Sequence, residues 1–248
     1  MTLQDFFKQQ NRVALAFSGG VDSAYLLYAG VKSGCDIHAY YVKSAFQPQF
    51  ELEDAVKLAE ELGAKMTVLE LDVLSDLQVV CNPANRCYYC KKLIFRNIIN
   101  AAKADGYEVL IDGTNASDDA SDRPGMRALQ ELQVRSPLRE CGITKSEVRK
   151  RSKEAGLFTW NKPAYACLAT RIPTGTEITA DKLHATEMSE KALTDLGFTD
   201  FRIRLSGQDA KIQVREEQLE KLLLYRREIL EKLKPYYSAV TVDLEVRS

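Results

Sequence analysis

The sequence predicts an α/β protein in which a Rossmann-like parallel sheet is followed by a small α+β domain. In the N-terminal half, apolar runs of strand length alternate with segments of helical periodicity, which is the pattern of right-handed βαβ units. After residue 175 the order changes to helix, hairpin, helix and strand. We therefore expect one domain over residues 1–175 and a second over residues 176–248.

The elements of the first domain follow from apolar spacing and from glycines that end helices. Thr144 and Glu147 form the capping-box pattern that begins a helix. The expected helices cover residues 2–11, 24–32, 51–62, 91–105 and 144–155, and the expected strands cover residues 13–17, 36–42, 65–71 and 109–111.

The second domain is shorter and mixes both element types. Helices are expected over 180–196 and 216–233, and strands over 201–205 and 210–214, joined by a hairpin turn at 206–209. Apolar residues alternate over 239–246, which predicts a half-buried strand.

Composition limits the function classes. The 248 residues are 45% hydrophobic and carry 34 Lys and Arg against 35 Asp and Glu, a formal net charge of −1. This balance argues against a nucleic acid partner. The N-terminus lacks a signal-peptide core and no apolar run spans a bilayer, so we expect no membrane partner and a cytoplasmic location. Six cysteines are then expected to be reduced, metal-bound or catalytic.

A glycine-rich hexapeptide follows the first strand and opens a helix. It consists of Ser18, Gly19, Gly20, Val21, Asp22 and Ser23. Backbone N–H groups at such a helix start collect phosphate, and glycine lets the anion approach closely. Asp22 beside a phosphate suggests Mg²⁺, whose shell combines carboxylate and phosphate oxygens. The alternative is a plain turn that caps a helix. The motif is not a Walker A sequence, because no Gly-Lys-Ser/Thr follows.

A Cys-x-x-Cys pair, Cys87 and Cys90, can grip a metal or a cluster, with a redox dithiol as the competing interpretation. Cys167 lies far along the chain. Three thiols leave a tetrahedral zinc site one ligand short but suit a four-iron cluster with one open iron. Cys81 is a possible fourth ligand, whereas Cys35 and Cys141 are expected to be packed as small apolar groups.

Polar residues follow the strand at 109–111. Asp112, Gly113, Thr114 and Asn115 come first, at the strand end where ligands bind in parallel sheets. Further carboxylates and arginines that could complete a magnesium or phosphate site are Asp118, Asp119, Asp122, Arg123 and Arg127. The alternative is a loop of Asx turns.

Arg202 and Arg204 alternate on one expected strand and therefore share a face. Such a pair either faces solvent at the edge of a sheet or binds an anion, as a clamp. The sequence pattern leaves both possibilities open.

Together these motifs resemble LarE. The order of residues 18–23, 86–91, 112–115, 122–125, 136–139 and 163–171 is similar to that in this family of ATP-dependent sulfur transferases. The family makes the nickel-pincer nucleotide and belongs to the PP-loop ATP pyrophosphatases, which have an adenine nucleotide alpha hydrolase-like fold. The similarity extends to the strand bearing Arg202 and Arg204.

The resemblance implies that ATP and Mg²⁺ adenylylate a carboxylate of pyridinium-3,5-biscarboxylic acid mononucleotide. Sulfur then displaces AMP and leaves a thiocarboxylate. Residues 18–23, Gly113, Thr114, Asn115, Arg123 and Arg127 would bind ATP, and Asp22, Cys167 and Arg171 would be catalytic. Arg202 and Arg204 would face the mononucleotide phosphate, with Glu190 near them. The second domain would bind substrate or form a homo-oligomer, commonly a hexamer in this family.

The family has two sulfur sources. In one branch the cysteine matching Cys167 is the donor and is consumed as dehydroalanine. In the other branch three cysteines hold a [4Fe-4S] cluster whose extra sulfide is transferred. Because Cys87, Cys90 and Cys167 are all present, we favour the cluster branch.

Three rival functions remain. A tRNA thiolation enzyme also joins a PP-loop to a cysteine-held cluster, but the neutral charge balance weakens it. An amidotransferase-type synthetase would not need the three cysteines. A nucleotide-binding regulatory protein with a structural metal would release no pyrophosphate.

Overall fold

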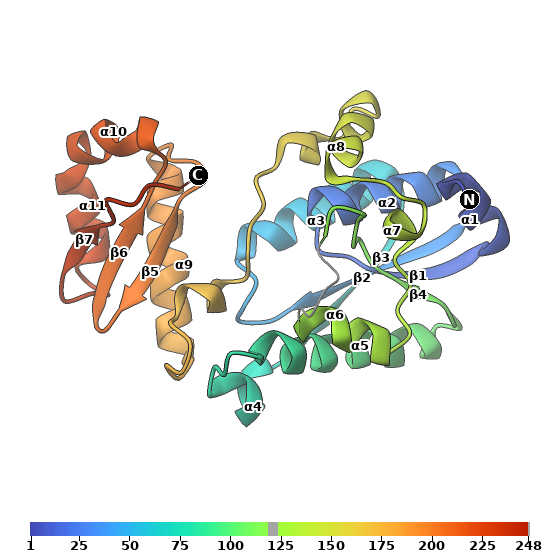
Figure 1. The fold of residues 1–248 in the computed structure, drawn as a ribbon, viewed down its shortest axis with the longest axis horizontal. Helices are drawn as coiled ribbons and strands as arrows, with labels where there is room; N and C mark the ends of the chain where they lie inside the picture. Colours follow the sequence, from blue (N-terminus) through green and yellow to red (C-terminus); the bar gives the residue numbers. More distant parts are fainter. Residues whose placement is uncertain (119–123, 248) are drawn as a thin grey trace. The chain divides into compact units, whose positions relative to one another are not determined.

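The computed structural model describes residues 1–118 and 124–247, and the chain divides into two compact units (Figure 1). Unit 1 comprises Met1–Val73 and Asn85–Tyr165, and unit 2 comprises Leu74–Ala84 and Ala166–Ser248. This division differs from the expected boundary after residue 175 in two ways. It falls after Tyr165, and it assigns residues 74–84 to the second unit.

Residues 74–84 join unit 2 through hydrogen bonds of the buried Asn82 side chain and of the Val80 backbone. Asn82 is 1% exposed, and its Nδ2 donates to the carbonyls of Ile172 at 3.3 Å and Pro173 at 2.8 Å. The Val80 carbonyl accepts the N–H of Ile178 at 2.9 Å. Sequence periodicity does not report such pairing, since the partners are about ninety residues apart.

The elements of unit 1 alternate strand and helix as predicted. They are α1 (Leu3–Gln9), β1 (Arg12–Ala16), α2 (Val21–Lys32), β2 (Asp36–Lys43), α3 (Gln49–Leu62), β3 (Lys65–Glu70), α5 (Arg86–Ala104), β4 (Leu110–Ile111), α6 (Pro124–Glu131), α7 (Pro137–Glu140), α8 (Lys145–Glu154) and the 3-10 turn η2 (Phe158–Asn161). The turn η1 (Val73–Ser75) lies where the chain first passes into unit 2.

Unit 1 confirms the predicted α/β fold class. Its strands form one parallel sheet in the order β3-β2-β1-β4. Residues of β1 alternate between two apolar cores: Val13 and Leu15 pack with α2, α3 and α8, whereas Ala14 packs with α5 and α6. Figure 1 shows these helices on opposite faces of the sheet. Covering both faces is what a buried parallel sheet requires.

Unit 2 is the predicted small α+β part. Its elements are α4 (Leu77–Val80), η3 (Leu168–Arg171), α9 (Ala180–Asp195), β5 (Arg202–Ser206), β6 (Asp209–Gln213), η4 (Glu216–Gln218), α10 (Leu219–Leu224), α11 (Arg226–Leu233) and β7 (Val240–Val242). The β5–β6 hairpin is antiparallel, and β7 pairs parallel with β6. Across residues 1–118 and 124–247, no helix combines the length and the apolar character needed to cross a membrane.

Two element predictions in unit 2 are wrong. The helix expected over 216–233 is interrupted at Tyr225, whose φ of −89° and ψ of 11° leave the helical region. The interruption lets Tyr225 pack on the core that contains Phe198. The strand expected over 239–246 ends at Val242, and Leu244 is 88% exposed.

Candidate active site

The glycine-rich hexapeptide forms the predicted strand–turn–helix. Gly20 is the N-cap of α2, and Val21 is its first residue. Gly19 has φ of +69°, which favours glycine, and a Cβ there would lie 3.1 Å from the Cβ of Ala55. The first N–H groups of a helix have no partner four residues earlier, so this turn presents donors to an anion.

The two serines of the hexapeptide hold the turn. Ser18 Oγ and Ser23 Oγ are 3.1 Å apart, and the Ser18 N–H donates to Ser23 Oγ at 3.3 Å. Ser23 is 3% exposed and donates to the Gly20 carbonyl at 3.2 Å. Ser18 is exposed, so Ser23 shapes the loop from within while Ser18 remains accessible to a ligand.

Asp22 lies at the centre of a polar cluster drawn from three segments. Asn115, which is 2% exposed, donates from Nδ2 to Asp22 Oδ1 at 3.2 Å. Lys145 Nζ forms an ion pair with Asp22 Oδ2. The backbone N–H of Lys145 donates to Ser117 Oγ at 3.0 Å. Sequence reasoning missed Lys145, although the capping box of α8 places it as the first residue of that helix.

The Asp112–Asn115 loop follows β4 and packs directly on the phosphate loop. Asp112 accepts from Ser136 Oγ at 2.7 Å and from Thr114 Oγ1 at 2.5 Å. A Cβ on Gly113 would lie 2.9 Å from the backbone nitrogen of Ser23. Since β1 and β4 are adjacent and parallel, their carboxyl ends bring both loops together, as the sequence predicted.

We expect Gly113→Ala to weaken the ATP binding that the family resemblance implies by about tenfold or more, because the new methyl group displaces the Ser23 backbone. We expect it to destabilise the protein by about 1–3 kcal/mol, as overpacking does. Gly34→Ala is the matched control: its φ is +71° with nothing within 4 Å, so it costs stability without moving the loop. Calorimetric titration and urea unfolding measure both effects. Equal ATP affinity in the two variants would contradict the prediction.

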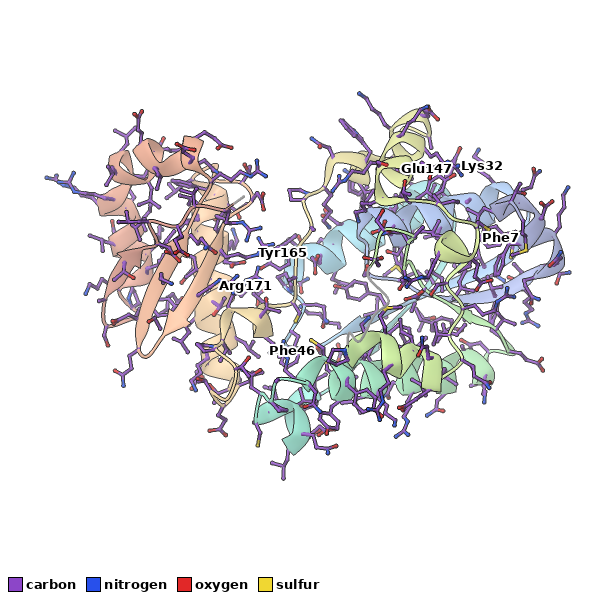
Figure 2. The ribbon with its side chains drawn as sticks, viewed as in Figure 1. Phe7, Lys32, Phe46, Glu147, Tyr165 and Arg171 are labelled. Carbon is purple, nitrogen blue, oxygen red and sulfur yellow. The ribbon has the colours of Figure 1, made fainter. Side chains whose placement is uncertain are left out.

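Cys167 and its neighbours lie in unit 2. Cys167 is half-buried and is the N-cap of η3. Arg171, labelled in Figure 2, is 1% exposed, and its guanidinium pairs with Glu190 at 2.8 Å. The sequence did not indicate this pair as one buried unit. A catalytic role for Arg171 through substrate contact stays a prediction, although its burial favours an indirect role.

Arg202 and Arg204 occupy alternate positions on β5. Arg202 is 6% exposed and donates to the Phe201 carbonyl at 2.6 Å. Arg204 is half-buried and donates to the Thr170 carbonyl at 3.1 Å. Because Arg202 is buried and Arg204 is half-buried, neither side chain fits the interpretation of a solvated edge. Binding of an anion by this pair stays a prediction.

Cys87 and Cys90 lie on the first turn of α5, because this helix begins at Arg86 and not at the expected residue 91. Residues three apart share a helix face. Cys87 is exposed and Cys90 is half-buried. Both belong to unit 1, and Cys167 belongs to unit 2. Within the described residues, no group of three or more His, Cys, Asp or Glu side chains is arranged to hold a metal ion.

The other cysteines differ in accessibility. Cys81 is exposed and ends α4. Cys35 is buried and donates to the Gln10 carbonyl at 3.3 Å, and burial raises the pKa of its thiol to about 11. Burial also raises the pKa of Cys141. Raised thiol pKa values leave little thiolate at neutral pH, so Cys35 and Cys141 are poor nucleophiles.

Arg127 is the remaining predicted phosphate contact in the described residues. Its Nε donates to Glu131 at 3.0 Å, and its guanidinium lies 4.9 Å from the Tyr88 ring centroid. Hydrogen bonds from Lys92, and then from Tyr88 and Arg127, lower the pKa of Glu131 to about 2. An ATP contact by Arg127 stays a prediction. Asp119, Asp122 and Arg123 lie outside the described residues.

Comparison with known proteins covers both units. The family model of thiamine biosynthesis protein (ThiI) matches residues 7–191. Pyridinium-3,5-bisthiocarboxylic acid mononucleotide synthase of Lactiplantibacillus plantarum is 33% identical, over 98% of this chain and 89% of that protein. An uncharacterized protein of Synechocystis sp. is 35% identical, over 98% and 92%.

A tRNA-specific 2-thiouridylase of Clostridium botulinum is 28% identical over 60% of this chain and 52% of that enzyme. The match to the synthase is therefore both longer and closer than the match to the thiouridylase. With a phosphate loop built as the sequence predicted and similarity along nearly its whole length to this synthase, the chain belongs to the LarE family of PP-loop proteins.

Proposed function

We propose that this protein is an ATP-dependent sulfur transferase that converts the carboxylates of pyridinium-3,5-biscarboxylic acid mononucleotide into thiocarboxylates. The observation that carries the proposal is the share of the chain over which it is similar to the synthase. Similarity to the synthase extends over 98% of the chain, whereas the thiouridylase matches only 60%. The second unit, which holds Cys167, Arg202 and Arg204, is therefore part of the similarity.

The phosphate loop supports the first step. A substrate carboxylate oxygen attacks the α-phosphorus of ATP, the bond to the β-phosphate breaks, and pyrophosphate leaves. The α2 N-terminus, Ser18, Thr114 and Asn115 would bind the nucleotide, and Lys145 would neutralise phosphate charge. Asp22 fits Mg²⁺, because it is a half-buried carboxylate at the phosphate loop. Bound there, Mg²⁺ would offset the charge that develops on pyrophosphate.

Cys167 supports the second step. A sulfur nucleophile attacks the acyl carbon of the adenylate, the carbon–oxygen bond breaks, and AMP leaves. Arg202 and Arg204 would bind the mononucleotide phosphate, for which charge-assisted hydrogen bonds are well suited. Repetition at the second carboxylate would give the bis-thiocarboxylate.

The cysteine set supports a [4Fe-4S] cluster as the sulfur carrier. Cys87 and Cys90 fit as two ligands, since they share one accessible helix face. The third thiolate that the family resemblance implies matches Cys167. We propose Cys167 as the third ligand. A bound cluster would supply sulfide from outside the polypeptide, which permits more than one turnover.

The decisive experiment measures pyrophosphate and thiocarboxylate anaerobically with ATP, Mg²⁺ and the pyridinium mononucleotide. After reconstitution with iron and sulfide, we expect several sulfurs transferred per protein, and Cys87→Ala to abolish this. Cys141→Ala is the control, because it removes a different thiol of unit 1. Transfer of one sulfur, with loss of about the mass of H₂S at Cys167, would instead favour the sacrificial branch. Pyrophosphate release that needs tRNA would contradict the proposal, and so would no release at all.

Two further predictions accompany the proposal. The cytoplasmic location stays a prediction, and so does the homo-oligomer, which the resemblance implies is commonly a hexamer. Unit 2 exposes Leu223, Leu224 and Leu244 at 64%, 79% and 88%, which is apolar surface that self-association would bury.

A further inference from the structure

A buried network in unit 2 holds the backbone on both sides of Cys167. Arg171 Nη1 lies 2.9 Å from the Ala166 carbonyl and 3.4 Å from the Cys167 carbonyl. The Cys167 carbonyl also accepts from the Thr170 N–H at 3.0 Å and from Thr170 Oγ1 at 2.8 Å. Fixing the two peptide planes that flank a residue fixes the direction of its Cα–Cβ bond. The position of the Cys167 Cβ atom, from which the thiol extends, is therefore set by the Arg171 guanidinium.

Glu190 anchors that guanidinium. Its two carboxylate oxygens accept from Arg171 Nε at 2.8 Å and from Nη2 at 3.0 Å. The side chains of this pair are 1% and 5% exposed. A bidentate ion pair that is shielded from water is strong in one geometry only. Reorienting the guanidinium therefore costs free energy.

The same carboxylate reaches the strand that bears the two arginines. Glu190 Oε1 accepts the N–H of Ile203 at 3.0 Å, and Ile203 lies between Arg202 and Arg204. Arg204 Nη1 donates back to the Thr170 carbonyl at 3.1 Å. The contacts thus close a ring that runs through η3, α9 and β5.

We propose that Arg171 and Glu190 are positioning residues that fix the backbone and Cβ of Cys167 relative to the strand that bears Arg202 and Arg204. This inference rests on the proposed function, in which the arginines bind the substrate phosphate and Cys167 helps to hold the group that carries the sulfur. The ring fixes the distance between the bound substrate phosphate and the sulfur. Attack by sulfur on the adenylated carboxylate is then faster than attack by water. Without that alignment, water attacks the acyl carbon and returns the carboxylate and AMP.

The test counts thiocarboxylates formed per pyrophosphate released. Arg171→Met combined with Glu190→Leu removes both charges, which a folded core tolerates better than one unpaired charge. We expect the ratio to fall about 100-fold, as for a misplacement near 1 Å. Lys191→Met combined with Asp195→Leu is the control, an exposed pair on the same helix. An unchanged ratio in the folded double variant would overturn the inference.

A milder variant covers the case in which the double variant does not fold. Thr170→Ala removes the hydroxyl that links Arg171 Nη1, at 2.8 Å, to the Cys167 carbonyl. We expect the ratio to fall about fivefold, the value of one hydrogen bond, and Thr170→Ser to restore it. Equal ratios for wild type and Thr170→Ala would reject the positioning role.

A second readout separates this inference from the proposed function. Amide hydrogen exchange over residues 166–172 should accelerate in Thr170→Ala and in the double variant, but not in the Lys191 and Asp195 control. If the wild-type protein forms neither product, the proposed function fails and exchange still decides whether the ring holds Cys167. Unchanged exchange would overturn the inference even in an active enzyme.

Discussion

Cys167→Ser is expected to lower thiocarboxylate formation by about 1000-fold or more, the scale seen when a central catalytic group is removed. A serine hydroxyl is a far weaker nucleophile and cluster ligand than a thiolate. The fold should be largely kept, because the hydrogen bonds from Thr170 and Arg171 are accepted by the carbonyl of residue 167, which serine retains. Pyrophosphate release should persist, since the phosphate loop is in unit 1. Mass spectrometry of the nucleotide and a coupled pyrophosphate assay measure both products.

Cys81→Ser is the matched control for that variant. Cys81 is an exposed thiol in the same unit, and a three-cysteine site does not need it. Retention of more than a tenth of wild-type sulfur transfer by Cys167→Ser would show that sulfur is delivered elsewhere. An equal loss in Cys81→Ser would make Cys81 a fourth ligand.

Asp22→Asn is expected to lower substrate-dependent pyrophosphate release by about 100- to 1000-fold, the range for removing one electrostatic contact to a transition state. Asparagine keeps the shape of the side chain but loses the charge that would bind Mg²⁺ and pair with Lys145. Stability should change little, because the Asp22 and Lys145 side chains are 20% and 35% exposed, and such pairs contribute about 0–1 kcal/mol. The release rate, measured across Mg²⁺ concentrations, should show a higher requirement for the metal.

Asp36→Asn is the control for this change. Asp36 forms ion pairs with Arg12 and Lys65 at the start of β2, at the opposite strand end from the phosphate loop. The Asp36→Asn variant also loses ion pairs, but it should release pyrophosphate at the wild-type rate. An unchanged Mg²⁺ requirement in Asp22→Asn would remove Asp22 from the metal site.

Local patterns predicted much of the fold. The Gly19 turn, the Thr144 capping box and the hairpin at Gly207 each depend on residues within a few positions of one another, and the structure contains all three. The parallel sheet followed from strand and helix alternation, because crossover rules leave few topologies. The interruption at Tyr225 was not predictable from helical periodicity, which continues through it; contact with Phe198 accounts for it.

By itself, then, the sequence determined the phosphate loop, the two-part architecture and the family motifs, all of which are encoded in short spacings. Only the tertiary structure decided that Lys145 pairs with Asp22, that Gly113 packs on Ser23, and that Arg171 and Glu190 form one buried pair. These contacts join residues from different elements of the fold. Their energies depend on burial and on distances of about 3 Å, which no local periodicity specifies.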